Sequence, residues 1–290
     1  MSSDPTATPP PDPPKSFFEK AGAALPIALT AIATAFAGMS TSELQRAMFW
    51  RSYAAQDQAK ATSQWTLAGF KRDRSLICQV AAAQLRATAG NPPNPFAGSN
   101  GEPNSPAAWL AGDGPPPAKL PEVADEALKK LLADIQARAP EAEQLRQAGR
   151  VPQATINAAI NDAEKAVEQL DREWEPTIKA AGKLAAGDKT PLPAAQAAGY
   201  ELEQRRYRIE AGLNQGVGYL YEARVKVSAA ESDRHQDKSR KFFYAMLAAQ
   251  IGATISSLAL ARKQQSVLWA VAGGSGLVAL VIGAYVYLSA

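Results

Sequence analysis

The chain has 290 residues, of which 46% are hydrophobic and 20% are charged, and its formal net charge is +3. Because its 31 basic and 28 acidic residues nearly balance, we expect no general affinity for nucleic acid. The single cysteine, Cys78, excludes an intramolecular disulfide and a cysteine metal cluster. The single histidine, His235, argues against most metal sites and against a catalytic triad with a histidine base.

The N-terminal part of the chain predicts a tail followed by a membrane span. Residues 1–20 are rich in proline, which cannot donate a backbone hydrogen bond, so we expect a disordered tail. Residues 21–39 carry no charge. As a helix they would extend about 28 Å at ~1.5 Å per residue, close to the hydrocarbon thickness of a bilayer. We therefore predict transmembrane helix 1 over residues 21–39.

Two alternatives stay open for this first apolar segment. Ala35-Phe36-Ala37 has the small-x-small form of a signal-peptide cleavage site, so the segment could be removed after export. It could also be a buried helix of a soluble core, although its length favours a span.

The next segments predict a long helix and a loop. Residues 40–89 continue the helical pattern of the first span, with a capping box at Ser40 and Glu43 unless the helix simply runs through. Gly90 and the prolines after it end this helix. Residues 90–118 hold eight prolines and predict a loop, with Trp109-Leu110 as its apolar anchor.

Residues 119–241 predict a helical region outside the membrane. Pro121 and the acidic residues after it predict a helix over 121–138. A further helix is predicted from Gln153 to Ala181, with Pro176 ending or kinking it, and the helical pattern resumes near Ala194. Apolar residues in the second of these helices recur at steps of four and three, which indicates coiled-coil-like packing: Ile156, Ile160, Ala163, Val167, Leu170 and Trp174.

Two further uncharged segments close the chain. Residues 242–261 and 266–288 are each long enough to cross a bilayer, and we predict them as transmembrane helices 2 and 3. The polar residues 262–265 between them predict the turn of an antiparallel hairpin, because a lysine or arginine at the bilayer centre costs about 2.5 to 3.5 kcal/mol. The predicted fold class is therefore all-α, with three transmembrane helices and a helical, coiled-coil-like soluble region.

Small residues inside the spans are candidates for helix contacts. Lipid is as apolar as leucine, so helices associate in it through close approach and hydrogen bonding. The candidates for such packing are Gly252, Ser256, Gly273, Gly276 and Gly283. Basic residues flank the spans on both predicted sides, so the charges leave the sidedness of residues 40–241 undetermined.

Residues near both ends of the chain carry a resemblance to a known family. After the first span, Ser63, Gln64 and Trp65 are followed by Lys71, and His235 lies just before the second span. These residues resemble the bacterial membrane protein family known as domain of unknown function 4337, over about the first 75 and the last 65 residues. The resemblance implies an inner-membrane protein with this architecture and gives no activity, and residues 90–200 depart from it.

No residue pattern predicts an enzyme, a cofactor or a metal site. His235 has only Asp233 and Asp237 near it in sequence, whereas a stable metal site needs three or four converging ligands. Cys78 lies in an apolar segment, which predicts a buried thiol without a catalytic role.

The function expected from these patterns is that of a non-enzymatic integral membrane scaffold. Its partners would be the lipid bilayer and, through the helical region, a protein or a second copy of the chain. Alternatives are a subunit of an oligomeric channel or transporter, a membrane-tethered enzyme, and a signal peptide followed by a C-terminal membrane hairpin.

Overall fold

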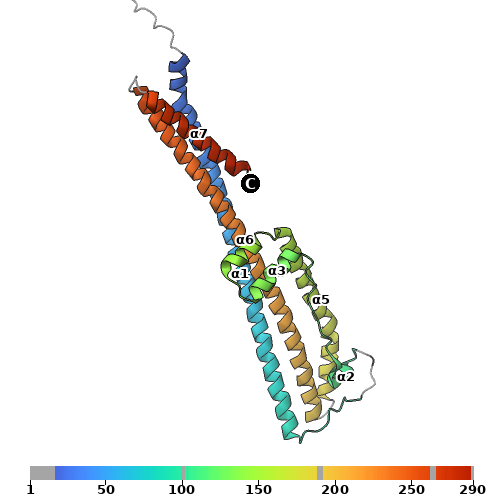
Figure 1. Cartoon of the computed structure of the whole chain (residues 1–290). Coiled ribbons are helices and arrows are strands. Elements are labelled where there is room, and N and C mark those ends of the chain that lie inside the picture. The colour runs from blue at the N-terminus through green and yellow to red at the C-terminus, as the bar shows by residue number, and fades with distance from the viewer. Residues whose placement is uncertain (1–16, 99–101, 103, 188–191, 262–265, 289–290) are drawn as a thin grey trace, which may run out of the picture. The chain divides into compact units, whose positions relative to one another are not determined.

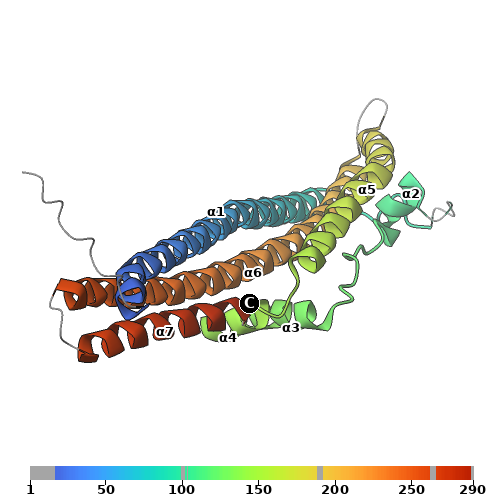
Figure 2. The ribbon, with the colours of Figure 1, turned by 90° about the horizontal axis from the view of Figure 1, so that it is seen from above.

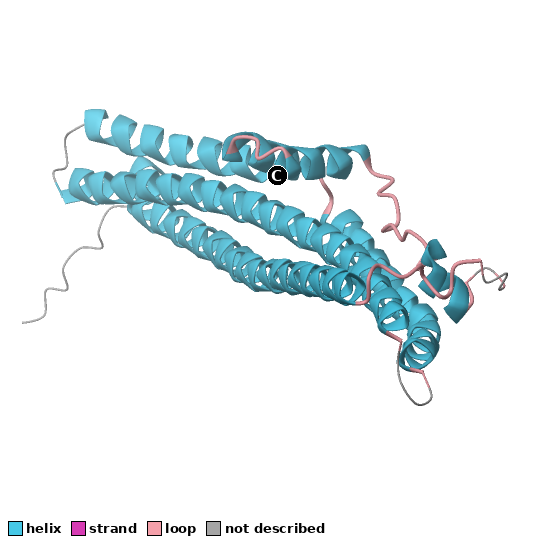
Figure 3. Cartoon of the chain, turned by 90° about the horizontal axis from the view of Figure 1, so that it is seen from below, coloured by secondary structure: helices cyan, strands magenta, loops and turns pink. Residues whose placement is uncertain are grey.

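A computed structural model describes residues 17–98, 102, 104–187, 192–261 and 266–288 (Figure 1). The described residues form seven α-helices and one short π-helical segment and contain no strand, which confirms the all-α fold class (Figure 3). The elements in chain order are α1 (Phe17–Thr88), α2 (Pro106–Ala108), η1 (Trp109–Asp113), α3 (Glu126–Gln136), α4 (Glu141–Ala148), α5 (Gln153–Ala186), α6 (Pro193–Ala261) and α7 (Ser266–Leu288). Most of the predicted tail and the predicted turn at 262–265 lie outside the described residues.

The chain divides into two compact units. The span unit comprises residues up to Met48 and from Ser232 onward, and the helical unit comprises Phe49–Glu231. The long helices α1 and α6 contribute to both units. The predicted segments 21–39 and 40–89 therefore lie on one continuous helix, and 242–261 is the end of α6.

The span unit contains three helices that are long and apolar enough to cross a membrane, one each from α1, α6 and α7 (Figure 2). Large apolar side chains point outward: Leu277, Val281 and Ile251 are 65%, 60% and 55% exposed. The buried positions hold mostly small residues, and on α7 they recur at steps of four and three: Ala272, Gly276, Ala279, Gly283 and Val286. A bundle with large apolar residues outside and small ones inside suits lipid rather than water, and it indicates a membrane protein.

Three of the predicted glycines lie at contacts between these helices. A Cβ at Gly252 would be 3.1 Å from both the Ala272 carbonyl oxygen and Leu29 Cδ1, so α1, α6 and α7 meet there. A Cβ at Gly276 would be 2.6 Å from Leu29 Cδ2, and one at Gly283 would overlap the Phe36 ring. The fourth contact residue, Ser256, is fully buried.

Gly273 lies at no helix contact within one copy of the chain. A Cβ there meets nothing within 4 Å, and the buried residue at this level is its neighbour Ala272. The helical period explains the difference. Residues that share a face of a helix recur at steps of three or four, so residue 272, four before Gly276, faces the bundle and residue 273 does not. Gly273 therefore lies outside the helix contacts within one copy of the chain, and a contact through it with a helix of another copy stays a prediction.

The helical unit has two apolar cores. The first joins α3, α5 and α6 with part of α1, and Leu128, Leu131, Ile156 and Ile160 are almost completely buried in it. The second surrounds Trp109 and Trp174, whose rings meet edge to face with centroids 6.2 Å apart. The predicted heptad-like residues of α5 are divided between these cores: Ile156, Ile160, Ala163 and Val167 lie in or against the first, and Leu170 and Trp174 in or against the second.

Two predicted boundaries in the helical unit were wrong. The helix expected to stop at Ala181 continues to Ala186 through Pro176, because Ala181 and Ala185 are buried against α6, which offsets the one hydrogen bond that a proline removes. The helix expected from Pro121 begins at Glu126, where the Leu128 amide donates to the side chain of Asp125 at 2.8 Å.

The predicted loop at 90–118 is only partly irregular. It contains α2 and η1, which begin where the Ala108 amide donates to Ser105 Oγ at 3.2 Å. Arg205 of α6 holds this segment in place: its Nε donates to the Gly114 carbonyl at 2.9 Å and its Nη2 to the Trp109 carbonyl at 2.8 Å. Trp109 and Leu110 are 2% and 1% exposed, as expected of an apolar anchor.

Candidate functional site

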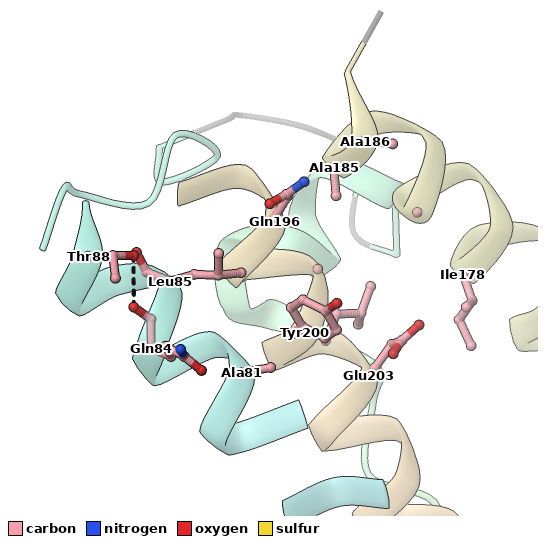
Figure 4. A pocket seen from close by; sticks show the side chains of 13 residues that line it. Ala81, Gln84, Leu85, Thr88, Ile178, Ala185, Ala186, Gln196, Tyr200 and Glu203 are labelled. Carbon is pink, nitrogen blue, oxygen red and sulfur yellow. Dashed lines mark hydrogen bonds between the residues drawn. The ribbon is translucent and has the colours of Figure 1, made fainter. Parts of the chain in front are cut away.

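A groove of about 620 Å³ lies in the helical unit between α1, α5 and α6 (Figure 4). We call it the stalk groove. The groove lies where α1 ends, α5 ends and α6 begins. Its lining residues are Ala81, Gln84, Leu85 and Thr88 from α1, Ile178, Gly182, Ala185 and Ala186 from α5, and Gln196, Gly199, Tyr200, Leu202 and Glu203 from α6.

Small residues create this groove. A Cβ at Gly199 would lie 3.1 Å from Ala185 Cβ, so α5 and α6 approach closely there. Gly182 on α5 and Ala81 on α1 also line the groove, and their short side chains leave the space next to this contact unfilled. The stalk groove is therefore open to solvent and is lined by all three helices.

The groove combines apolar and hydrogen-bonding groups. Leu85, Ile178 and Leu202 supply its apolar lining, and Gln84, Gln196, Tyr200 and Glu203 supply polar atoms. The lining therefore offers both apolar contacts and hydrogen-bond partners.

Cys78 lies next to the groove but has no properties of a nucleophile. Its Sγ donates to Glu203 Oε2 at 3.5 Å, and the residue is 6% exposed. Burial and the neighbouring Glu203 carboxylate raise the pKa of the Cys78 thiol to about 11. Since the thiolate is the reactive form, this shift lowers the reactivity of the thiol at neutral pH.

Exposed apolar side chains continue along α1 beside the groove. We call this surface the α1 apolar surface; it consists of Leu67, Phe70, Leu76, Ile77 and Val80, which are 41%, 61%, 59%, 66% and 65% exposed. A second cavity of about 460 Å³ lies over part of it, lined by Leu67, Phe70 and Ile77 with Lys71, Asp73 and Arg74. Five large apolar residues exposed on one stretch of helix exceed the scattered exposure that is normal in soluble domains, and such surfaces mark interaction sites.

The buried charges of the helical unit pair with one another rather than facing a cavity. Arg224 donates from Nε to Asp57 Oδ2 at 2.8 Å and from Nη1 to Asn157 Oδ1 at 3.2 Å. Tyr221 donates its hydroxyl to Glu164, and burial followed by this carboxylate raises the Tyr221 pKa to about 12. These paired groups fix how α1, α5 and α6 align and leave no group poised for acid–base catalysis among them.

The structure separates the three family-like residues. Trp65 packs edge to face on Tyr219 with centroids 4.8 Å apart, and Lys71 pairs with the buried carboxylate of Glu210. Both belong to the helical unit, whereas His235 belongs to the span unit. Each has a packing or pairing role within its own unit.

His235 is part of a polar contact between α1 and α6 where they leave the predicted spans. Its Nδ1 lies 2.6 Å from Glu43 Oε2, and Arg46 Nη1 donates to the other oxygen of Glu43 at 3.0 Å. Ser40 Oγ donates to the Ser239 carbonyl at 3.0 Å, and Ser239 Oγ donates to the Ser40 carbonyl at 2.8 Å. Ser40 and Glu43 therefore join two helices, and α1 runs through the predicted capping box.

Sequence reasoning missed the stalk groove and the α1 apolar surface. The signal was present in residues 40–89, where Leu67, Phe70 and Ile77 recur at steps of three and seven on one face of a long helix. The buried positions of that helix, such as Ala61, Ala68 and Ser75, hold small residues, so the apolar pattern of the sequence does not mark the buried face.

Among the described residues, no group of three or more His, Cys, Asp or Glu side chains is arranged to hold a metal ion. No protein family, curated protein or solved structure matches this chain. The resemblance to domain of unknown function 4337 therefore stays a prediction.

Proposed function

We propose that this chain is a non-enzymatic scaffold of the bacterial inner membrane that recruits a protein partner. The span unit anchors it in the bilayer, and the stalk groove with the α1 apolar surface binds an amphipathic helix of the partner. The α1 apolar surface is the observation that carries this proposal, because exposure of five large apolar residues to water is unfavourable unless a partner covers them.

The geometry of the groove supports a helix as the bound element. α1 and α5 form its two sides and α6 its floor, so a helix laid between them would complete a four-helix arrangement. Gln84, Gln196 and Glu203 would meet polar or basic residues at the edges of that helix, while Leu85, Ile178 and Leu202 would contact its apolar face.

Site-specific photocrosslinking in native membranes tests this proposal. A photoreactive residue at Val80 lies on the α1 apolar surface, and one at the exposed Lys130 on α3 provides the matched control. We expect one discrete crosslinked protein from position 80, lost when Ile77 is replaced by Asp, and none from position 130. Equal crosslinking from both positions, or a pattern that Ile77→Asp leaves unchanged, would contradict the proposal.

A second candidate function is a subunit of an oligomeric channel or transporter. It is favoured by a groove of about 400 Å³ in the span unit, lined in part by Thr30, Thr34, Gln250 and Thr254. Residues 22–42, 242–261 and 267–288 contain no charged side chain, so a charged relay within one copy has no support there. Conductance of vesicles reconstituted with the pure protein tests this candidate.

A further inference from the structure

Gln250 is an unpaired amide in the apolar part of the protein. It lies eight residues after Phe242 and eleven before Ala261, so it is near the middle of the second predicted span. At ~1.5 Å per residue it is about 12 Å or more from either end of that span. Its side chain is exposed and borders the groove between α1 and α6 in the span unit. We call this the span groove.

The other polar side chains at this depth already have acceptors within the bundle. In residues 25–37, 246–257 and 270–283 every hydroxyl donates to a backbone carbonyl, and Gln250 is the only polar side chain without a hydrogen bond there. These hydroxyls belong to Thr30, Thr34, Thr254, Ser256, Ser257 and Ser275. Hydrocarbon offers an amide no hydrogen-bond partner, so Gln250 is best satisfied by a polar group on another helix.

The chemistry of the amide favours a second copy of the same chain. A glutamine side chain has both donors and an acceptor, so two such side chains can satisfy each other. Copies that insert in the same orientation place Gln250 at the same depth, and a two-fold axis along the membrane normal brings the same residues of both copies together. A different membrane protein would satisfy Gln250 only if it also carried a polar group at this depth, whereas a second copy always does.

The shape of the span groove permits the required approach. Ala33, Ala37 and Ala253 lie among its lining residues, and their short side chains let another helix come close. Thr34 and Thr254 use their protons on their own helices, and their hydroxyl oxygens remain able to accept from an incoming amide.

We propose that two copies of this chain pair in the membrane through the span groove, with the Gln250 amides of the two copies hydrogen-bonded to each other. This pairing is independent of the stalk groove, because it involves only residues of the span unit.

Disulfide crosslinking in lipid vesicles tests the proposal with the full-length chain. In a Cys78→Ala background, Thr254→Cys places a thiol at the span groove, and Ile251→Cys places one at similar depth on another lipid-facing side of α6. We expect mild oxidation to join two copies through position 254 and to join few through position 251. Equal crosslinking at both positions, or none at position 254, would overturn the proposal.

The contribution of the amide is measured by energy transfer between labelled copies at increasing dilution in lipid. Hydrogen bonds between membrane helices contribute amounts that correspond to about fivefold to thirtyfold in a dissociation constant. We expect Gln250→Leu to weaken pairing by this factor, and Gln250→Asn, which keeps an amide, to weaken it less. Leucine favours insertion into the bilayer, so a loss of pairing in Gln250→Leu would not reflect failed insertion. Carbonate extraction of the variant verifies that it is inserted. An unchanged dissociation constant in Gln250→Leu would overturn the role of the amide.

Discussion

Replacing Gly283 by Ala should destabilise the bundle of the span unit, because the added Cβ has no room. A Cβ at this position would overlap both Cε1 and Cζ of Phe36. That ring is 9% exposed and lies stacked against Phe242 with centroids 6.2 Å apart, so it cannot move away without disturbing α6. Overpacking of this kind costs about 1 to 3 kcal/mol.

The matched control is Gly273→Ala on the same helix. A Cβ there meets nothing within 4 Å, so only the preference of helices for alanine over glycine, about 1 kcal/mol, should act, and it stabilises. Alanine at Gly283 gains the same preference, so we place the difference in bundle stability between the two variants at about 2 kcal/mol, roughly a thirtyfold change in the population of open bundles.

A buried thiol measures that opening. Ala279 lies fully buried in the bundle, and a cysteine there in a Cys78→Ala background reacts with a maleimide only when the helices separate. When reclosing is faster than the reaction, the labelling rate is proportional to the open population. We expect labelling in detergent micelles to be about thirtyfold faster with Gly283→Ala than with Gly273→Ala. Equal rates would refute the packing of Phe36 on Gly283.

Further predictions concern the helical unit. Asp57→Leu removes the carboxylate partner of the buried Arg224 guanidinium and should lower the free energy of unfolding by about 3 to 5 kcal/mol, measured by thermal unfolding. The double variant Asp57→Leu with Arg224→Met should lose less stability, and equal losses would contradict the role of the ion pair. With its pKa at about 11, the Cys78 thiol should be only ~0.1% ionised at pH 8, so alkylation of the folded chain should be about a hundredfold slower than that of an exposed thiol. Because the thiol ionises more easily when unfolded, its contribution to stability should be complete below pH 9.0 and should fall as the pH rises to about 11. Arg205→Ala removes the donors to the Trp109 and Gly114 carbonyls. Amide hydrogen exchange in residues 105–118 should then become at least about tenfold faster. Unchanged exchange rates would show that packing of Trp109 alone holds the segment in place.

The sequence predicted the helices well where one dominant physical term decided them. Uncharged stretches of about twenty residues indicate spans because hydrocarbon excludes charge, and no detail of packing changes that. The apolar period of α5 predicted its buried residues, since a helix must bury one face. The continuity of α1 also followed, because residues 40–88 contain no proline and only one glycine, Gly69.

What the sequence left open depends on contacts between distant residues. Pro176 is a local reason to end a helix, and the burial of Ala181 against α6 outweighs it. Gly273 and Gly276 look alike in sequence, and the contact of Gly276 with Leu29 on α1 shows which of the two faces the bundle. The stalk groove arises because small residues on three helices, Ala81, Gly182 and Gly199, leave space between them. No single sequence motif predicts such a groove.

The proposed scaffold role and the proposed pairing both require that the apolar segments of α1, α6 and α7 lie in a bilayer. Alkaline carbonate treatment of membranes containing the full-length chain, followed by flotation on a density gradient, measures this directly. We expect the chain to float with the lipid, because the outward surface of the span unit presents large apolar residues such as Leu277 and Val281. Release of the chain as a monodisperse species in detergent-free buffer would contradict the membrane assignment and the proposals that rest on it.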